Sequence, residues 1–192
     1  RTGDSNIIIA GGQESMSLAP HAIHLRDGKK LGDIEMTDTM IKDGLWDAFH
    51  GYHMGITAEN VAEKFQVTRE QQDKFALRSQ EKAIKSQKEN KFKEEIINFK
   101  IKSKKAEINF NKDEHPREGI DLETLSRLKP VFKKNGTVTA GNASGINDGA
   151  AAVTLMSGEL ADEKGLEKLV SIKSWASCGV DPALMGTGPI PS

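Results

Sequence analysis

The most informative stretch of the sequence is Thr139-Ala140-Gly141-Asn142-Ala143-Ser144-Gly145-Ile146-Asn147-Asp148-Gly149, which precedes an apolar run, Ala150 to Met156. Its glycines and alanines leave backbone N–H groups accessible, and its Asn and Ser side chains add further hydrogen-bonding groups. Such a surface suits an amide or phosphate ligand, although a plain tight connection between two strands has the same composition. The stretch has neither a Gly-Lys-Ser/Thr ending nor Gly-x-Gly-x-x-Gly spacing, which excludes a nucleoside-triphosphate or dinucleotide site on this loop.

Apolar runs on either side of this stretch predict the strands of an α/β core. Asn6 to Ala10 is a β-branched run followed by Gly11-Gly12, which is typical of a fully buried, parallel-type strand that ends in a tight turn. Ala150 to Met156 predicts a second buried strand, Ser157 to Lys164 a capped helix, and Leu169 to Trp175 a last strand. So few core strands cannot make a doubly wound sheet, and the rest of that sheet is not in the sequence.

The residues between these strands predict a mixed α/β excursion from about Met16 to Ile146. Thr57 is a predicted N-cap of a short helix, and a capping-box pattern at Thr68 begins a long polar helix. Apolar residues alternate with polar ones over residues 95–111, which favours a hairpin that turns across Ser103 to Lys105. The chain is therefore expected to be an α/β core interrupted by this excursion.

The composition limits the class of protein. With 192 residues, 36% of them hydrophobic, the chain is long enough for one good domain or two small ones. Its 27 Lys and Arg residues against 28 Asp and Glu residues give no global electrostatic basis for a nucleic-acid or membrane partner. Its apolar runs are far shorter than the roughly 20 residues that span a bilayer. The single cysteine excludes an internal disulfide and favours a reducing compartment.

The two ends of the sequence indicate a piece of a longer chain. It begins at Arg1 without a methionine and without the layout of a signal or transit peptide. It stops at Gly188 to Ser192, a segment typical of the entry to a turn.

Three side chains outside the glycine-rich stretch could carry chemistry, and each has an ordinary structural alternative. His53 precedes a predicted helix, where its imidazole could contact a ligand, although capping or core packing is the commoner use of histidine. Arg117 could bind phosphate oxygens through its guanidinium, although a surface salt bridge is commoner. Cys178 has no histidine after it and no basic residue nearby in the chain, so we expect a small semi-buried residue and not a nucleophile. The histidines and the cysteine form no zinc pattern, which argues against a metal site.

Four segments in order along the chain carry motifs of one enzyme family. They are Ala10-Gly11-Gly12-Gln13-Glu14-Ser15-Met16-Ser17, His53-Met54-Gly55-Ile56-Thr57-Ala58-Glu59-Asn60, Ala140 to Gly149, and Gly179-Val180-Asp181-Pro182 with Met185 to Pro191. Together they resemble the thiolase family, and within it most closely the acetyl-CoA acetyltransferases. The glycine-rich motif and His53-Met54-Gly55 are highly specific, so the resemblance favours the ligand-binding alternatives.

The resemblance implies a fragment of a thiolase fold, in which two similar βαβαβαββ halves carry an inserted α/β loop domain. Residues 1–15 would end the N-terminal half, and residues 16–146 would form the inserted domain that binds coenzyme A and contributes to oligomerisation. Residues 147–168 would give the last strand and helix of the N-terminal half, and residues 169–192 would begin the C-terminal half. Part of the excursion, from Leu25 to Leu45, resembles the tetramerisation segment of biosynthetic thiolases, which implies a homotetramer.

The resemblance also implies which residues bind substrate. Ser144 and the small-residue loop would bind the pantetheine arm of coenzyme A, and Arg117 with the region of Thr124 would hold its nucleotide end. Thr124 stands where close relatives often have serine, and its hydroxyl keeps the hydrogen bond possible. The pantetheine and acyl pocket would be lined by Leu45, His53, Met54, Phe132, Ala140, Ala143, Ile146 and Met185.

The implied reaction is the reversible conversion of two acetyl-CoA into acetoacetyl-CoA and CoA through an acyl-cysteine intermediate. Coenzyme A is then substrate and product, and no cofactor is expected. The nucleophilic cysteine would precede Asn6, and the activating histidine and second cysteine would follow Ser192, so no catalytic residue is expected here. A 3-ketoacyl-CoA thiolase of broader chain length and a stand-alone CoA-binding or assembly module are the alternatives. We expect a cytoplasmic protein of fatty acid metabolism, or a mitochondrial one if the parent carries a transit peptide.

Overall fold

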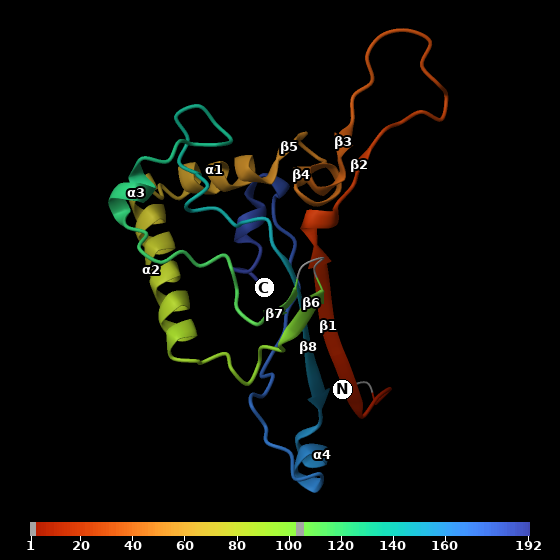
Figure 1. Ribbon diagram of the computed structural model, residues 1–192, viewed down its shortest axis with the longest axis vertical. Coiled ribbons are helices and arrows are strands. Elements are labelled where there is room, and N and C mark those ends of the chain that lie inside the picture. The colour runs from red at the N-terminus through yellow and green to blue at the C-terminus, as the bar shows by residue number, and fades with distance from the viewer. Residues whose placement is uncertain (1–2, 103–105) are drawn as a thin grey trace. The chain divides into compact units, whose positions relative to one another are not determined.

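The computed structural model describes residues 3–102 and 106–192, which belong to two compact units (Figure 1). The first unit comprises the chain up to His53 and again from Ile146 onward. The second unit runs from Met54 to Gly145. No helix of the described residues is long and apolar enough to cross a membrane.

The largest sheet of the first unit is an antiparallel pair of long strands. β1 (Ile7–Ser15) pairs with β8 (Asp148–Met156) along its whole length. The prediction of a parallel-type strand that ends at Gly11-Gly12 is therefore wrong, because β1 continues through both glycines to Ser15. A Cβ at Gly11 would overlap the carbonyl oxygen of Ala151, so glycine there permits close approach of the two strands and does not mark a turn.

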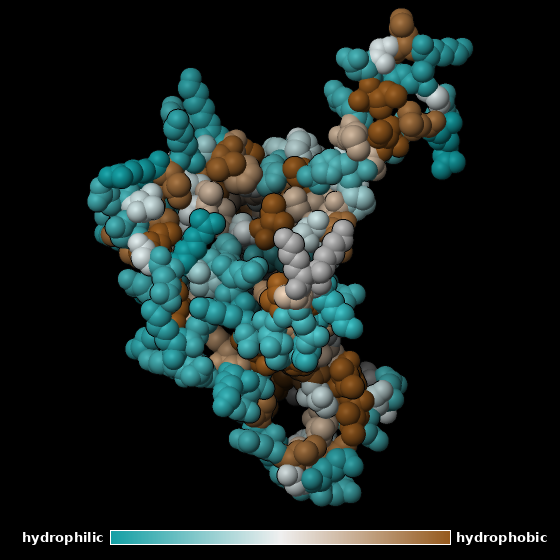
Figure 2. Space-filling view, in the orientation of Figure 1, coloured by the Kyte–Doolittle hydropathy of each residue, from teal (hydrophilic) through white to brown (hydrophobic). Residues whose placement is uncertain are grey.

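The side chains of this pair are exposed within the described chain. Exposed fractions between 37% and 77% are found for apolar residues of both strands, namely Ile7, Ile8, Ile9, Val153 and Leu155. They contribute to the hydrophobic surface over the lower end of β1 and β8 in Figure 2. The predicted burial of both strands is therefore not found in these residues.

The remainder of the first unit consists of short elements. They are η1 (Met16–Leu18), β2 (His21–Ala22) paired with β3 (Thr37–Asp38), η2 (Met40–Gly44), β4 (Trp46–Asp47) paired with β5 (Tyr52–His53), α4 (Gly158–Glu163) and η3 (Pro182–Thr187). The helix predicted after Ser157 is confirmed, because the Ser157 side chain accepts from the N–H of Leu160 at 3.2 Å. The strand predicted over Leu169–Trp175 is wrong: the segment has no assigned element and pairs with no strand among the described residues.

The described residues of the second unit form three helices and a hairpin: α1 (Met54–Lys64), α2 (Arg69–Lys88), β6 (Phe99–Lys102), β7 (Glu107–Phe110) and α3 (Leu122–Ser126). The capping box is confirmed, since Thr68 accepts from the N–H of Gln71 at 3.2 Å and donates its own N–H to the Gln71 side chain at 2.8 Å. β6 and β7 pair antiparallel, which confirms the hairpin, while its predicted turn at Ser103 to Lys105 lies outside the described residues.

Helix α1 begins three residues before its predicted N-cap. Thr57 lies inside the helix and is almost fully buried, and its hydroxyl donates to the carbonyl of Met54 at 2.6 Å. A threonine that bonds back to the preceding turn satisfies its hydroxyl without ending or starting a helix. The predicted cap at Thr57 is therefore wrong.

The contact between Gly11 and β8 predicts a clear difference between two neighbouring glycines. Gly11→Val should destabilise the chain by about 1–3 kcal/mol, because the new side chain forces the strands apart. Gly12→Val is the matched control, since a Cβ at Gly12 meets nothing within 4 Å. Urea unfolding of both variants measures the difference, and equal midpoints would contradict a close approach at Gly11.

Candidate functional site

The glycine-rich stretch begins as a compact turn around Thr139, which is fully buried. The carbonyl of Thr139 accepts from the N–H groups of Asn142 and Ala143 at 3.2 and 3.0 Å. The hydroxyl of Thr139 accepts from the N–H of Gly141 at 3.2 Å. Two residues of this turn that were predicted to bind substrate, Ala140 and Ser144, are exposed, and Ala143 is half-buried. The turn therefore holds its own backbone in place and presents small side chains to solvent.

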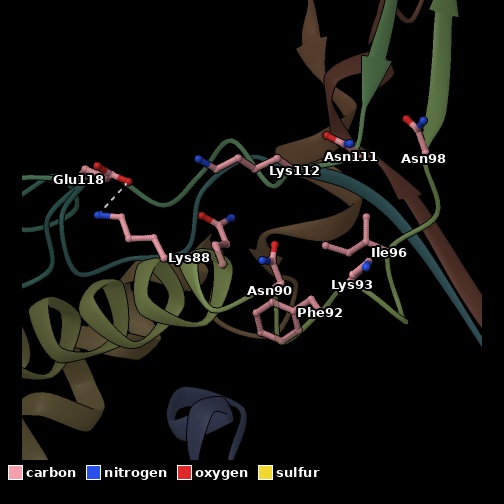
Figure 3. A pocket seen from close by; sticks show the side chains of 10 residues that line it. Lys88, Asn90, Phe92, Lys93, Ile96, Asn98, Asn111, Lys112 and Glu118 are labelled. Carbon is pink, nitrogen blue, oxygen red and sulfur yellow. Dashed lines mark ion pairs between the residues drawn. The ribbon is translucent and has the colours of Figure 1, made fainter.

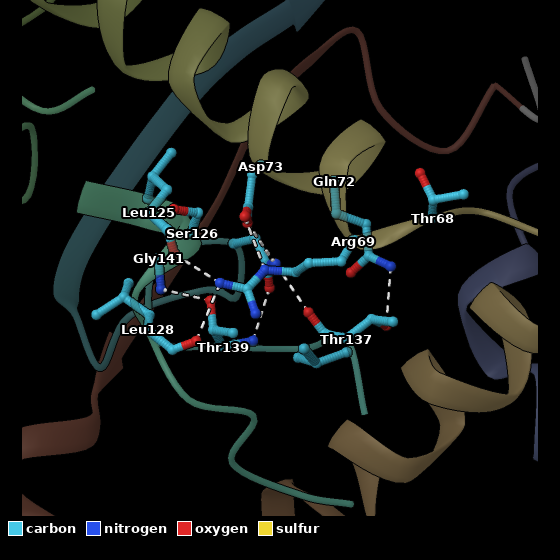
Figure 4. A network of polar contacts seen from close by, with 12 residues as sticks. Thr68, Arg69, Gln72, Asp73, Leu125, Ser126, Leu128, Thr137, Thr139 and Gly141 are labelled. Atoms are coloured by element: carbon cyan, nitrogen blue, oxygen red, sulfur yellow. Dashed lines mark hydrogen bonds and ion pairs between the residues drawn. The ribbon is translucent and has the colours of Figure 1, made fainter. Parts of the chain in front are cut away.

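Asn142 connects this turn to helix α2, from which Asp73 points toward the turn (Figure 4). Its amide nitrogen donates to Oδ1 of Asp73 and to the carbonyl of Thr137, both at 3.0 Å. Its amide oxygen accepts from the N–H of Thr139 at 2.8 Å. The amide nitrogen and the amide oxygen of Asn142 therefore both have hydrogen-bond partners within the protein.

Arg69 connects the same part of α2 to α3. Its Nε donates to Oδ2 of Asp73 at 2.7 Å, and its Nη2 donates to the carbonyls of Leu125 and Leu128 at 2.5 and 3.0 Å. The side chains of Leu125 and Leu128 leave no room for a Cβ at Gly141. Glycine at 141 therefore lets the turn pack directly on α3.

Glu59 of α1 holds the chain just before the turn. Its carboxylate is buried and accepts from the N–H and hydroxyl of Thr137 and from the N–H of Val138, at 2.8–3.0 Å. Gln72 of α2 adds a bond to the Thr137 hydroxyl at 2.9 Å. Two buried carboxylates, from two helices, thus fix residues 137–142.

Other predicted site residues of the second unit lie at its helices. Phe132 is half-buried with its ring against Gly55, which brings it to the start of α1 beside Met54. Thr124 is exposed in the first turn of α3, and its N–H donates to Asp121 at 2.7 Å. The side-chain and backbone hydrogen bonds of Thr124 lower the pKa of Asp121.

Arg117 lies beside the middle of α2. Its backbone N–H donates to the side chain of Gln80 in α2 at 2.9 Å, and the residue is exposed. Within residues 3–102 and 106–192 its guanidinium has no ion pair, so it can meet an anion from solvent.

His53, in the first unit, is placed by the β4–β5 hairpin, where it lies opposite Trp46. Asp47 organises this hairpin, since its carboxylate contacts His50 Nδ1 at 2.7 Å and accepts the N–H groups of Phe49 and His50 at 2.9 and 3.4 Å. Burial alone would raise the pKa of Asp47, but these hydrogen bonds bring it below its usual value. The hairpin therefore gives half-buried His53 a defined place at the end of the unit.

The remaining predicted residues of the first unit are less enclosed. Leu45 is half-buried at the end of η2, whereas Ile146 is 64% exposed and Met185, in η3, is 46% exposed. The structure thus brings together Met54 with Phe132, and the residues of the 139–145 turn with α3.

One cavity of the second unit is lined by none of the predicted residues. It encloses about 380 Å³ near the end of α2, with Lys88, Lys93 and Lys112 around Phe92 (Figure 3). Lys88 pairs with Glu118 at 3.4 Å. Among the described residues no group of three or more His, Cys, Asp or Glu side chains could hold a metal ion.

Glu59, Arg69 and Asp73 support the turn, and none of them was predicted as a site residue. Each is a polar residue of a helix, and no spacing rule separates such residues from the solvated face of a helix. The capping box just before Arg69 was the nearest signal, because it fixes where α2 begins.

The buried carboxylate of Glu59 predicts a stability difference between two glutamates of α1. Glu59→Gln should lower the free energy of unfolding by about 1–3 kcal/mol, since one amide face then opposes buried N–H donors. Glu63→Gln loses an exposed pair with Lys133 and should cost less than about 1 kcal/mol. Urea unfolding measures the free energy of unfolding of both variants. An equal loss in both would show that the buried bonds of Glu59 stabilise the unit no more than the exposed pair of Glu63 does.

Comparison with known proteins places these features in one family. Residues 1–159 match the thiolase N-terminal domain. The chain is 59% identical over 191 residues to an acetyl-CoA acetyltransferase of Rhizobium meliloti and 52% identical over 192 residues to a rat protein named acetyl-CoA acetyltransferase, cytosolic. These matches cover 100% and 99% of the chain but 49% and 48% of the relatives, so the chain spans about half their length.

Solved structures give the same result for the fold. A Bacillus anthracis acetyl-CoA acetyltransferase matches with a TM-score of 0.92 at 46% identity, over 98% of this chain and 48% of that one. Human mitochondrial 3-ketoacyl-CoA thiolase matches with a TM-score of 0.90 at 41% identity, over 97% and 48%. The expected α/β thiolase fold is confirmed, and the chain belongs to the thiolase family.

Proposed function

We propose that this chain is part of an acetyl-CoA acetyltransferase. The parent enzyme would convert two acetyl-CoA reversibly into acetoacetyl-CoA and CoA, through an acetyl group carried on a cysteine. The observation that carries this proposal is that relatives of that name are more than half identical along essentially the whole chain. Coenzyme A would be both substrate and product, with no further cofactor.

The geometry of the second unit supports a binding role for coenzyme A. Asp73 holds the 139–145 turn through Asn142, Glu59 holds the two residues just before Thr139, and the turn presents the exposed Ala140 and Ser144. Pantetheine carries amides and hydroxyls, which a small hydroxyl side chain and accessible backbone groups can meet. Ser144, with Ala140 and Ala143, would therefore hold the pantetheine arm.

The nucleotide end and the acyl end would be bound by separate groups. Exposed Arg117 would bind phosphate oxygens, and the Thr124 hydroxyl would add a hydrogen bond. The acyl and pantetheine pocket would be lined by Leu45, His53, Met54, Phe132, Ile146 and Met185. The nucleophilic cysteine, the activating histidine and the second cysteine would come from parts of the parent outside these residues.

In the proposed reaction a cysteine thiolate takes the acetyl group from one acetyl-CoA and releases CoA. A base then removes a methyl proton from the second acetyl-CoA, and the resulting carbanion attacks the acetyl-cysteine, which regenerates the thiolate. The residues of this chain would contribute by holding coenzyme A, and such contacts act equally on the ground state and the transition state.

A second candidate is a thiolase of broader chain length. The match to human mitochondrial 3-ketoacyl-CoA thiolase, at 41% identity, favours it as the alternative. The steady-state rate constants of the intact parent on acetoacetyl-CoA and on a long-chain 3-ketoacyl-CoA separate the two. The proposal requires CoA-dependent cleavage with kcat/KM higher for acetoacetyl-CoA, and a preference for the long chain would overturn it.

We also propose a cytoplasmic homotetramer that acts in fatty acid metabolism. A relative named as cytosolic supports the compartment. The loop between β2 and β3 exposes Ile23, Leu25, Leu31 and Ile34, at 41–92%, and would supply contacts between subunits.

The proposed phosphate contact predicts a selective effect of Arg117→Ala in the intact parent. Loss of one charge-assisted bond costs about 1.5–3 kcal/mol, so KM for CoA substrates should rise at least about tenfold while kcat stays nearly unchanged. Arg78→Ala is the control, because it removes an exposed arginine of α2 that the proposal does not use. An unchanged KM in Arg117→Ala would place that residue outside the site.

A further inference from the structure

Asp73 is a buried charged residue with two different partners. Its side chain is 5% exposed, and the Arg69 guanidinium beside it balances its charge through Oδ2. Its other oxygen, Oδ1, accepts from Asn142. One carboxylate oxygen therefore serves the ion pair within α2, and the other serves the glycine-rich turn (Figure 4).

This arrangement sets the orientation of the Asn142 amide. A carboxylate accepts hydrogen bonds and cannot donate them, so the amide nitrogen must face Asp73. The amide oxygen then faces the N–H of Thr139, and the second amide hydrogen reaches the carbonyl of Thr137. If the amide turned over, oxygen would face oxygen at Asp73 and at Thr137, and nitrogen would face the N–H of Thr139. All three bonds would be lost.

We propose that Asp73 is a positioning residue for coenzyme A binding, which acts through Asn142 on the turn that carries Ala140 and Ser144. The inference rests on the proposed function. Asp73 is buried behind the turn and is not expected to touch the ligand. A turn fixed in advance loses less conformational entropy when a ligand binds, so Asp73 strengthens binding in the ground state and the transition state alike.

Asp73→Asn keeps the shape of the side chain but offers one acceptor oxygen in place of two. That oxygen can accept from Arg69 or from Asn142, and the new NH2 group then faces a donor on the other side. In the intact parent, the Kd for CoA and the KM for acetoacetyl-CoA should rise about tenfold, while kcat changes less than about twofold. Glu70→Gln is the matched control, since it removes the same charge from an exposed position of α2 whose partner is Lys74 at 2.6 Å.

A second variant covers the case in which Asp73→Asn does not accumulate as folded protein. Asn142→Ser leaves the Arg69–Asp73 pair intact, so the buried charge stays balanced, but it removes the bond between Asp73 and the turn. It should show the same rise in Kd and KM. A merely structural role of Asp73 would lower the melting temperature and the fraction of active enzyme without raising Kd or KM.

Calorimetry with CoA and steady-state kinetics with acetoacetyl-CoA are run on the same preparations of the intact parent. Raised Kd and KM in the folded variants, with Glu70→Gln unchanged, support the inference. Unchanged Kd in folded Asn142→Ser overturns it, and so does a wild-type parent that does not bind CoA. A parent that binds CoA but does not cleave acetoacetyl-CoA overturns the proposed reaction, and the Kd comparison still decides the role of Asp73.

Discussion

The arrangement of the second unit depends on hydrogen bonds to two buried carboxylates, those of Glu59 and Asp73. They come from different helices and accept hydrogen bonds from residues 137, 138 and 142, in the chain just before and within the glycine-rich turn. Buried carboxylates are costly unless all their oxygens are bonded, so the backbone and side-chain donors around them are held in place. The turn therefore has a fixed place despite a composition that would otherwise leave it flexible.

The second constraint on the unit is that two close contacts have room only for glycine. Gly141 packs against Leu125 and Leu128, and Gly55 packs against Phe132, where a Cβ would overlap in each case. These contacts bring the turn to α3 and bring Phe132 to the start of α1. The same residues that look flexible in the sequence are thus points of close packing. Rigid support behind an exposed surface of small side chains is what a binding site for a long, thin ligand requires.

Two local capping patterns were predictable from the sequence, whereas the cap predicted at Thr57 was wrong and the long-range hydrogen bonds were not predicted. The capping box at Thr68 and the cap at Ser157 join residues three apart, so their patterns are visible in the chain. The antiparallel pairing of β1 with β8 joins residues more than 130 positions apart, and the run before Gly11-Gly12 does not specify direction or partner. The exposure of β1 and β8 and the lack of an assigned strand over Leu169–Trp175 were likewise not visible in the local sequence pattern.

The substrate-binding residues of the candidate site were predicted from family resemblance. The buried residues that hold them in place were found only in the structure. The motif around Ser144 consists of consecutive residues, so it can be recognised in the sequence. Glu59 and Asp73 are far from it in the sequence, and their hydrogen bonds to residues 137–142 form only in the folded unit.

A crystal structure of the intact parent with bound CoA would show whether the 139–145 turn binds the ligand. We expect the pantetheine arm along residues 139–145, with Ser144 in contact, the phosphates near Arg117, and the Asp73–Asn142 bond intact. Coenzyme A bound in the lysine-lined cavity near Phe92, with the 139–145 turn free of ligand, would contradict it.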